Sequence, residues 1–111
     1  MKQFFIDKDI ALEKVSEDIT RKILAYSENL MVVKAFFAEN GIGYDHTHEH
    51  EQVTYCVSGK FEYYLNGNTV ELNPGDSVIV YSNQPHGLKC IKEGCLLDIF
   101  TPARKDFLGD K

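Results

Sequence analysis

The feature that most constrains this chain is the placement of its four histidines. His46, His48 and His50 alternate along one short segment, and His86 stands directly behind a proline much later in the sequence. Neutral imidazole is a good ligand for borderline divalent transition metals. Ligands supplied from two distant segments can serve one ion only if the fold brings those segments together.

The rest of the chain has the pattern of short β-strands separated by turn residues. No stretch shows convincing helical periodicity, and residues 10–15 are compatible with either a single turn or a short strand. Eight or more short, evenly spaced strands in a chain of this size predict a sandwich or a closed barrel. The expected strands cover residues 19–26, 30–38, 54–58, 61–65, 68–72, 77–81, 87–91 and 95–100.

Turn residues define the boundaries of these strands. Asn66-Gly67 supplies the two positive-φ positions of a type I′ turn, which predicts a hairpin. The segment 73–76 (Asn-Pro-Gly-Asp) is predicted to form another tight turn, because proline fixes φ and glycine accepts positive φ. Turns are also expected at 59–60 and at 92–94, where a glycine interrupts the strand-like pattern.

Length and charge limit the class of protein. A chain of 111 residues predicts one domain spanning 1–111. No apolar run approaches the length of a membrane span, and the start of the chain turns acidic too early for a signal peptide, so we expect no membrane association and a cytoplasmic protein. A net charge of −5 with scattered basic residues disfavours nucleic-acid binding.

The cysteines, Cys56, Cys90 and Cys95, are odd in number and include no Cys-x-x-Cys pair. This pattern argues against a disulfide framework and fits a reducing compartment. Thiolate metal ligation is the competing use. Because all three cysteines fall in strand-like runs, we expect them to be small core residues instead.

Two motifs extend the histidine pattern. The first is His-x-His-x3-Gln-x6-Gly from His46 to Gly59, and the second runs from Pro74-Gly75-Asp76 to Pro85-His86. In this order they resemble the two motifs of the cupin superfamily, β-barrels that hold one divalent metal. The resemblance implies an all-β, single-domain cupin fold (a double-stranded β-helix, or jelly-roll barrel), with motif one at 43–59 and motif two at 74–87. The ligands that it implies are His46, His48, Gln52 and His86.

Gln52 stands where the superfamily usually has glutamate. An amide oxygen coordinates without adding charge, so the ion keeps its full positive charge and is a better partner for an anionic ligand. The same change disfavours a redox iron site. His50 has the strand parity of His46 and His48 and could replace Gln52 if that residue faced away. We expect instead that the chain bends at residues 48–50 and leaves His50 at the rim.

The last strand carries a carboxylate within an apolar run. Asp98 shares a strand face with Phe100, and if it points inward it must be paired or functional, because an isolated buried carboxylate is costly. Its pKa would then rise through burial or fall near a cation. The alternative is a solvated Asp98 on the outside. Arg104 could hold a substrate carboxylate near the barrel mouth, or it could be an ordinary surface arginine.

The segments 48–55 and 97–108 resemble the small single-domain cupins of pectin and alginate catabolism, the KdgF-type uronate ring-opening enzymes. This resemblance implies metal-dependent ring opening and tautomerisation of 4,5-unsaturated uronate monosaccharides to linear 5-keto-4-deoxyuronates, an isomerase-type activity. It implies catalytic roles for Asp98, Phe100 and Arg104, an anionic sugar as substrate and a homodimer. The alternatives are a non-catalytic sugar-acid-binding cupin and a metal-dependent dioxygenase.

The identity of the metal stays open at this point. Three imidazoles and one amide accept Ni, Zn, Co, Fe or Mn, and the general order of affinities does not choose among them.

Overall fold

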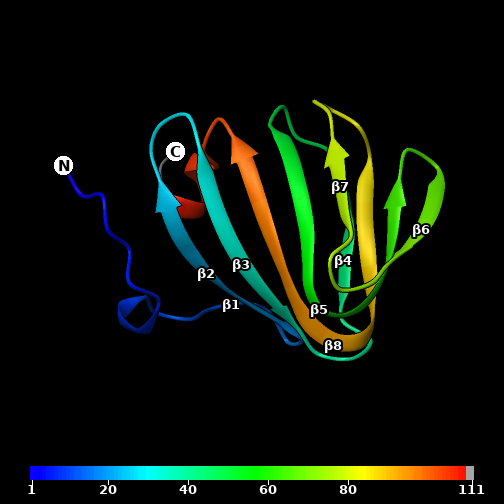
Figure 1. The fold of residues 1–111 in the computed structure, drawn as a ribbon. Helices are drawn as coiled ribbons and strands as arrows, with labels where there is room; N and C mark the ends of the chain where they lie inside the picture. The colour runs from blue at the N-terminus through cyan, green and yellow to red at the C-terminus, as the bar shows by residue number, and fades with distance from the viewer. Residues whose placement is uncertain (110–111) are drawn as a thin grey trace.

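The structure is a computed structural model that describes residues 1–109; Asp110 and Lys111, which end the expected domain, lie outside the described residues. Residues 1–109 contain eight strands and two short 3-10 helices (Figure 1). In order they are η1 (Asp7–Asp9), β1 (Glu13–Ser16), β2 (Ile19–Tyr26), β3 (Met31–Phe37), β4 (Ile42–His46), β5 (Glu51–Leu65), β6 (Asn68–Leu72), β7 (Ser77–Val80), β8 (His86–Thr101) and η2 (Lys105–Leu108).

Two long strands, β5 and β8, run side by side through the whole molecule (Figure 1). They are antiparallel, and their register runs from Glu51 opposite Thr101 to Leu65 opposite His86. At the end of the ladder near Glu51 and Thr101, β3, β2 and β1 continue the sheet beside β8, and β7 pairs with β5. At the other end, β4 pairs with β8 and β6 pairs with β5. The bent sheet encloses two hydrophobic clusters, and this architecture confirms the all-β barrel predicted from the sequence.

The turns predicted at 59–60 and 92–94 are wrong, because both segments lie inside the long strands. The register of β5 against β8 shifts at Cys56/Ser58 and again beside Lys60, so β-bulges replace the predicted reversals. Gly59 has a φ of 86°, and a Cβ there would lie 2.6 Å from the carbonyl oxygens of Lys92 and Glu93. A glycine lets two strands approach closely where the sheet folds, and it gives the same local signal as a turn.

The other turn predictions are confirmed. Asn66 and Gly67 have φ values of 50° and 87° between β5 and β6, as a type I′ hairpin requires. In the next turn the amide of Asp76 donates to the carbonyl of Asn73 over 2.9 Å. The ambiguous segment 10–15 runs into β1, after the 3-10 turn η1.

The core is built from the strand residues that point inward, which alternate along each strand with residues that point outward. In β3 every second residue from Met31 to Phe37 is buried, as strand periodicity predicts. Phe61 and Leu96 lie at the centre and are fully buried. The three cysteines are free and buried, which confirms their prediction as core residues. Burial raises the pKa of the Cys90 thiol to about 11.

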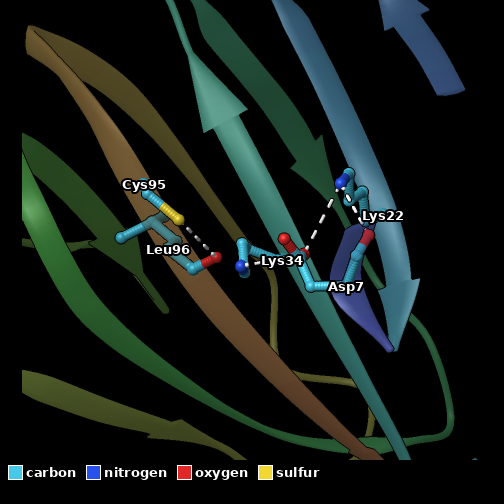
Figure 2. A network of polar contacts seen from close by, with 5 residues as sticks. All are labelled: Asp7, Lys22, Lys34, Cys95 and Leu96. Atoms are coloured by element: carbon cyan, nitrogen blue, oxygen red, sulfur yellow. Dashed lines mark hydrogen bonds and ion pairs between the residues drawn. The ribbon is translucent and has the colours of Figure 1, made fainter. Parts of the chain in front are cut away.

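Asp7 holds the N-terminal segment against the outer face of the sheet through ion pairs with two lysines. Lys22 and Lys34 lie opposite each other in β2 and β3, and Asp7 binds both (Figure 2). Asp7 Oδ1 lies 3.2 Å from Lys34 Nζ and 3.5 Å from Lys22 Nζ. Its hydrogen bond with Lys34 lowers the pKa of Asp7. Within residues 1–109 we find no helix with the length and apolar character needed to cross a membrane.

Candidate metal centre

Three histidines from two distant segments converge inside the barrel. His46 ends β4 and lies opposite His86, the first residue of β8, while His48 follows β4 in the loop. One ligand atom from each lies within 4.8 Å of the others. Strand alternation was expected to align His46 and His48, but β4 ends at His46. The pairing of β4 with β8 and the loop conformation therefore bring these rings together.

The hydrogen bonds of His46 and His86 fix their tautomers. In each of the three rings Nδ1 contacts a backbone carbonyl two residues away, and a carbonyl oxygen can only accept. The Nε2 of His46 and of His86 therefore keeps a free lone pair, which is the arrangement found around ligated metals. In His48 both ring nitrogens face oxygen atoms, so its proton can lie on either one. The Nδ1–O distances are 2.9 Å for His46 to Tyr44, 3.0 Å for His48 to His50 and 2.9 Å for His86 to Gln84.

Burial keeps the inner rings neutral. It lowers the pKa of His86 to about 4 and also lowers the pKa of His48. The Nε2 of His86 is buried and has no hydrogen-bond partner within residues 1–109. A buried lone pair without a partner is costly, and a cation at the meeting point of the three Nε2 atoms would satisfy it. The three histidines therefore fit a divalent transition metal.

Gln52, near the start of β5, points toward the same place. Its amide nitrogen donates to Thr54 Oγ1 over 2.9 Å and to Asp98 Oδ1 over 3.2 Å. The amide oxygen therefore faces the histidines, with Oε1 2.9 Å from His48 Nε2. With a proton on Nε2, His48 donates to this oxygen; with the proton on Nδ1, both atoms offer lone pairs that a shared cation would bind. The role of Gln52 as a fourth ligand stays a prediction.

His50 lies beside the centre but outside the group of three. The chain bends at Glu49 and His50, as predicted, and the His50 ring packs edge-on against His48 with centroids 5.4 Å apart. The alternative in which His50 replaces Gln52 required Gln52 to face away. Gln52 is buried and faces inward.

Asp98 points into the barrel from β8. It lies opposite Thr54 of β5, and its Oδ1 accepts hydrogen bonds from Thr54 Oγ1 over 2.7 Å and from Gln52 Nε2. The alternative of an outward, solvated Asp98 is therefore excluded. Burial raises the pKa of Asp98, while the hydrogen bonds from Thr54 and Gln52 oppose that rise.

The three residues expected to act in catalysis line one cavity with the centre. Its volume is about 140 Å³, and its walls include Asp98, Phe100, Arg104, His46 and His86. Pockets for drug-sized ligands begin at about 300 Å³, so this one suits a ligand of monosaccharide size or smaller. A larger hollow of about 650 Å³ borders β6 and β7, and none of the histidines lines it.

Arg104 belongs to the cavity and not to the open surface. Its side chain is only 13 % exposed, and its guanidinium lies 5.2 Å from the centre of the Phe100 ring. Phe100 in turn packs edge-on against His48, with centroids 5.9 Å apart. A cationic group, an aromatic ring and a carboxylate thus surround one space. Their chemical roles remain predictions.

Known proteins share this sequence and architecture. The family model of the cupin domain matches residues 35–100, which is more than half of the chain. The chain is a cupin. Over 97 % of its length it is 38 % identical to the pectin degradation protein KdgF of Dickeya dadantii (strain 3937), of which it covers 100 %.

Solved structures agree with this assignment. The cupin superposes on KdgF from Halomonas sp. with a TM-score of 0.92 and 34 % identity, covering 96 % of this chain and 99 % of the other. An RmlC-like cupin from Shewanella frigidimarina gives a TM-score of 0.93 and 36 % identity, covering 96 % of each chain. The polyketide cyclase RemF from Streptomyces resistomycificus, at 22 % identity and a TM-score of 0.78 over 92 % of this chain and 80 % of that one, shares the fold alone.

Some polar residues of the cupin site were missed in the sequence. Thr54 supports Asp98, and Tyr63 OH lies 3.4 Å from Thr54 Oγ1. Asp106 pairs with Arg104 through two hydrogen bonds. The available signal for Thr54 was its strand parity with Gln52, two residues earlier. For Asp106 it was the Arg-x-Asp spacing, which is too common to single out.

Proposed function

We propose that this cupin opens and tautomerises 4,5-unsaturated uronate monosaccharides to linear 5-keto-4-deoxyuronates, in the catabolism of pectin or alginate. The observation that carries the proposal is one small cavity lined by histidines of the centre, an inward-facing carboxylate and an arginine. The similarity to KdgF, a protein named for pectin degradation, supports it over nearly the full chain. A cavity of about 140 Å³ also favours a monosaccharide over a polymer.

One divalent transition metal is proposed to sit between His46, His48 and His86, with Gln52 as fourth ligand. When bound, it supplies positive charge that stabilises the negative charge developing on a substrate oxygen. All four side chains are neutral donors. The site therefore keeps a net positive charge and favours an anionic ligand.

Asp98 is proposed to carry the proton. Ring opening removes the proton of the anomeric hydroxyl, forms the aldehyde carbonyl and breaks the bond between the anomeric carbon and the ring oxygen, which keeps the electron pair as an enolate oxygen. Tautomerisation adds one proton to C4, so the reaction is an isomerisation with no net redox change. Oδ1 of Asp98 is held by Thr54 and Gln52, while Oδ2 makes no hydrogen bond within residues 1–109 and is available to accept and return this proton.

Arg104 and Phe100 are proposed to bind the substrate. A guanidinium binds a carboxylate through two parallel hydrogen bonds, which fixes the orientation of the sugar. The Phe100 ring offers an apolar face between Arg104 and His48. This arrangement would orient the sugar between the histidine centre and Asp98.

The test is an absorbance assay with freshly prepared unsaturated galacturonate. We expect metal-loaded protein to accelerate the loss of the near-UV absorbance of the conjugated double bond, and metal-free protein to be slow. Absence of any metal-dependent acceleration contradicts the proposal. Binding without product would indicate a sugar-acid-binding cupin, and oxygen consumption by iron-loaded protein would indicate a dioxygenase. Elemental analysis of the purified protein identifies the metal.

A homodimer is proposed as the assembly, because the outer face of the larger sheet half carries an apolar row. Val32, Ile99, Val53 and Ile79 lie opposite one another across four neighbouring strands. Ile79 remains 44 % exposed. Contact with a second copy would cover this row. Light scattering coupled to size-exclusion chromatography tests the assembly, and cell fractionation tests the expected cytoplasmic location.

A further inference from the structure

The guanidinium of Arg104 is hydrogen-bonded to a neighbouring carboxylate. Its Nε donates to Asp106 Oδ1 over 3.0 Å, and its Nη2 donates to Asp106 Oδ2 over 2.9 Å. The acceptor lies in the 3-10 turn η2, directly after Arg104. Two parallel hydrogen bonds to one carboxylate fix both the position and the plane of a guanidinium.

An aromatic ring from the same turn supports that plane. The guanidinium carbon of Arg104 lies 4.3 Å from the centre of the Phe107 ring, and that of Arg21 in β2 lies 3.9 Å from it. Phe107 also packs edge-on against Phe100, with centroids 5.7 Å apart. Arg104 is therefore held on one edge by a carboxylate and on one face by an aromatic ring.

The exposures show which side of the pair faces outward. The Asp106 side chain is 59 % exposed, whereas the Arg104 side chain is 13 % exposed and lines the cavity. Asp106 accepts one hydrogen bond from Nε and one from Nη2 of Arg104. The Nη1 donors of Arg104 make no hydrogen bond within the described part of the chain. The Nη1–Nη2 end thus remains available for a second carboxylate.

We infer that Asp106 is a positioning residue, which holds the Nε–Nη2 edge of Arg104 at the rim and so presents the Nη1–Nη2 end to a ligand carboxylate in the cavity. The inference rests on the proposed function for the identity of that ligand, a uronate. Phe107 completes the support by fixing the face of the guanidinium. The C-terminal turn is then part of the binding site, although Asp106 itself does not touch the ligand.

A competing role for Asp106 predicts the opposite result. If Asp106 merely occupied Arg104 until a substrate carboxylate displaced it, its removal would strengthen binding. Loss of one negative charge near the cavity would also favour an anion by itself. Weaker binding after removal of Asp106 therefore excludes both displacement and the change of charge as its cause.

The experiment compares Asp106→Asn with Glu13→Gln in metal-loaded protein. Glu13 pairs with Arg21 in the same stack, so this control removes an equal charge and one ion pair without touching Arg104. Calorimetry is run with galacturonate, which carries the carboxylate and lacks the reactive double bond, and with neutral galactose. In Asp106→Asn we expect the Kd for galacturonate to rise about fivefold, as for a partly exposed ion pair, with galactose unchanged.

Two further readouts separate positioning from a structural role. On unsaturated galacturonate, KM should rise in Asp106→Asn while kcat stays within about twofold of wild type, because the reacting groups are untouched. Asp106→Glu should restore part of the affinity, since it keeps the carboxylate. Glu13→Gln should bind both sugars like wild type.

Each remaining outcome overturns the inference. These outcomes are an unchanged or lower Kd for galacturonate in Asp106→Asn, an equal loss of galactose affinity, an equal effect of Glu13→Gln, and a wild-type protein that does not bind galacturonate. Asp106-dependent binding in a protein without turnover would remove the proposed reaction but keep the inference. Normal turnover by the wild type, together with unchanged galacturonate binding in Asp106→Asn, would keep the proposed reaction and remove the inference.

Discussion

At the scale of single residues, the site depends on side chains in which one polar atom is held by a hydrogen bond within the protein and another polar atom faces the centre. Each of the three histidines uses Nδ1 on a backbone carbonyl, and Gln52 uses its amide nitrogen on Thr54 and Asp98. The atoms that remain free therefore point at one space.

Asp98→Asn tests the proton carrier. An amide of nearly the same shape cannot accept and return the proton, so we expect turnover to fall by about a hundredfold or more. Metal content should stay at the wild-type value, because Asp98 contacts Gln52 and none of the histidines. Steady-state kinetics and elemental analysis of the same preparation measure both quantities. Retained activity would remove Asp98 from the mechanism.

His46→Ala and His50→Ala form a matched pair for the metal site. We expect His46→Ala to lose most of its bound metal, because one of three converging imidazoles disappears. His50→Ala should keep its metal, since His50 lies outside that group. Metal content by elemental analysis decides the comparison. Equal content in the two variants would contradict the assignment of His46.

At the scale of elements, the bends inside β5 and β8 shape the cavity. Gly59 and Gly94 face each other where the two strands shift register, and a Cβ on Gly94 would collide with the backbone of Ser58. The bulges allow each strand to serve both halves of the sheet. As a result β8 supplies His86 near one end and Asp98 and Phe100 near the other.

Gly59→Ala and Gly67→Ala separate the cost of conformation from the cost of crowding. Both glycines have φ near 87°, but nothing lies within 4 Å of a Cβ on Gly67, whereas carbonyl oxygens lie 2.6 Å from one on Gly59. We expect Gly67→Ala to lower the free energy of unfolding by about 1 kcal/mol. Gly59→Ala should lower it by roughly 3 kcal/mol or more. Urea unfolding measures both, and equal losses would contradict close packing at the bend.

At the scale of the whole molecule, closure of the sheet removes the three thiols from solvent. Cys56, Cys90 and Cys95 lie on the long strands, and burial raises the pKa of each thiol, in Cys90 to about 11. The thiolate is the form that reacts with alkylating reagents. The folded protein therefore keeps its cysteines in the unreactive form at neutral pH.

Thiol labelling as a function of pH tests this burial. A free thiol gains reactivity as pH rises through about 8.5, but a pKa near 11 keeps Cys90 protonated at pH 9. We expect native protein to resist iodoacetamide from pH 7 to 9 and to label fully in urea. Mass spectrometry counts the adducts. Rapid labelling of Cys90 in the native protein at pH 8 would contradict the closed barrel.

The sequence by itself determined which side chains are available as metal ligands and where most of the strands lie. The Asn66-Gly67 hairpin and the strand at residues 30–38 are local signals, and each was interpreted correctly because it depends on neighbouring residues alone. Only the tertiary structure decided that the glycines at 59 and 94 bend long strands, because positive φ and a missing side chain suit bulges and turns equally.

The same limit applies to orientation within the site. Strand parity showed that Asp98 and Phe100 share a face, but the pairing of β8 with β5 decided that this face is the inner one. Likewise, the sequence pointed to Arg104 but not to Asp106. Contact of Phe107 with Arg21, a residue of the distant strand β2, helps to place the Arg104–Asp106 pair beside the cavity that Arg104 lines. Such outcomes depend on contacts between segments far apart in the chain, and local sequence patterns carry no information about them.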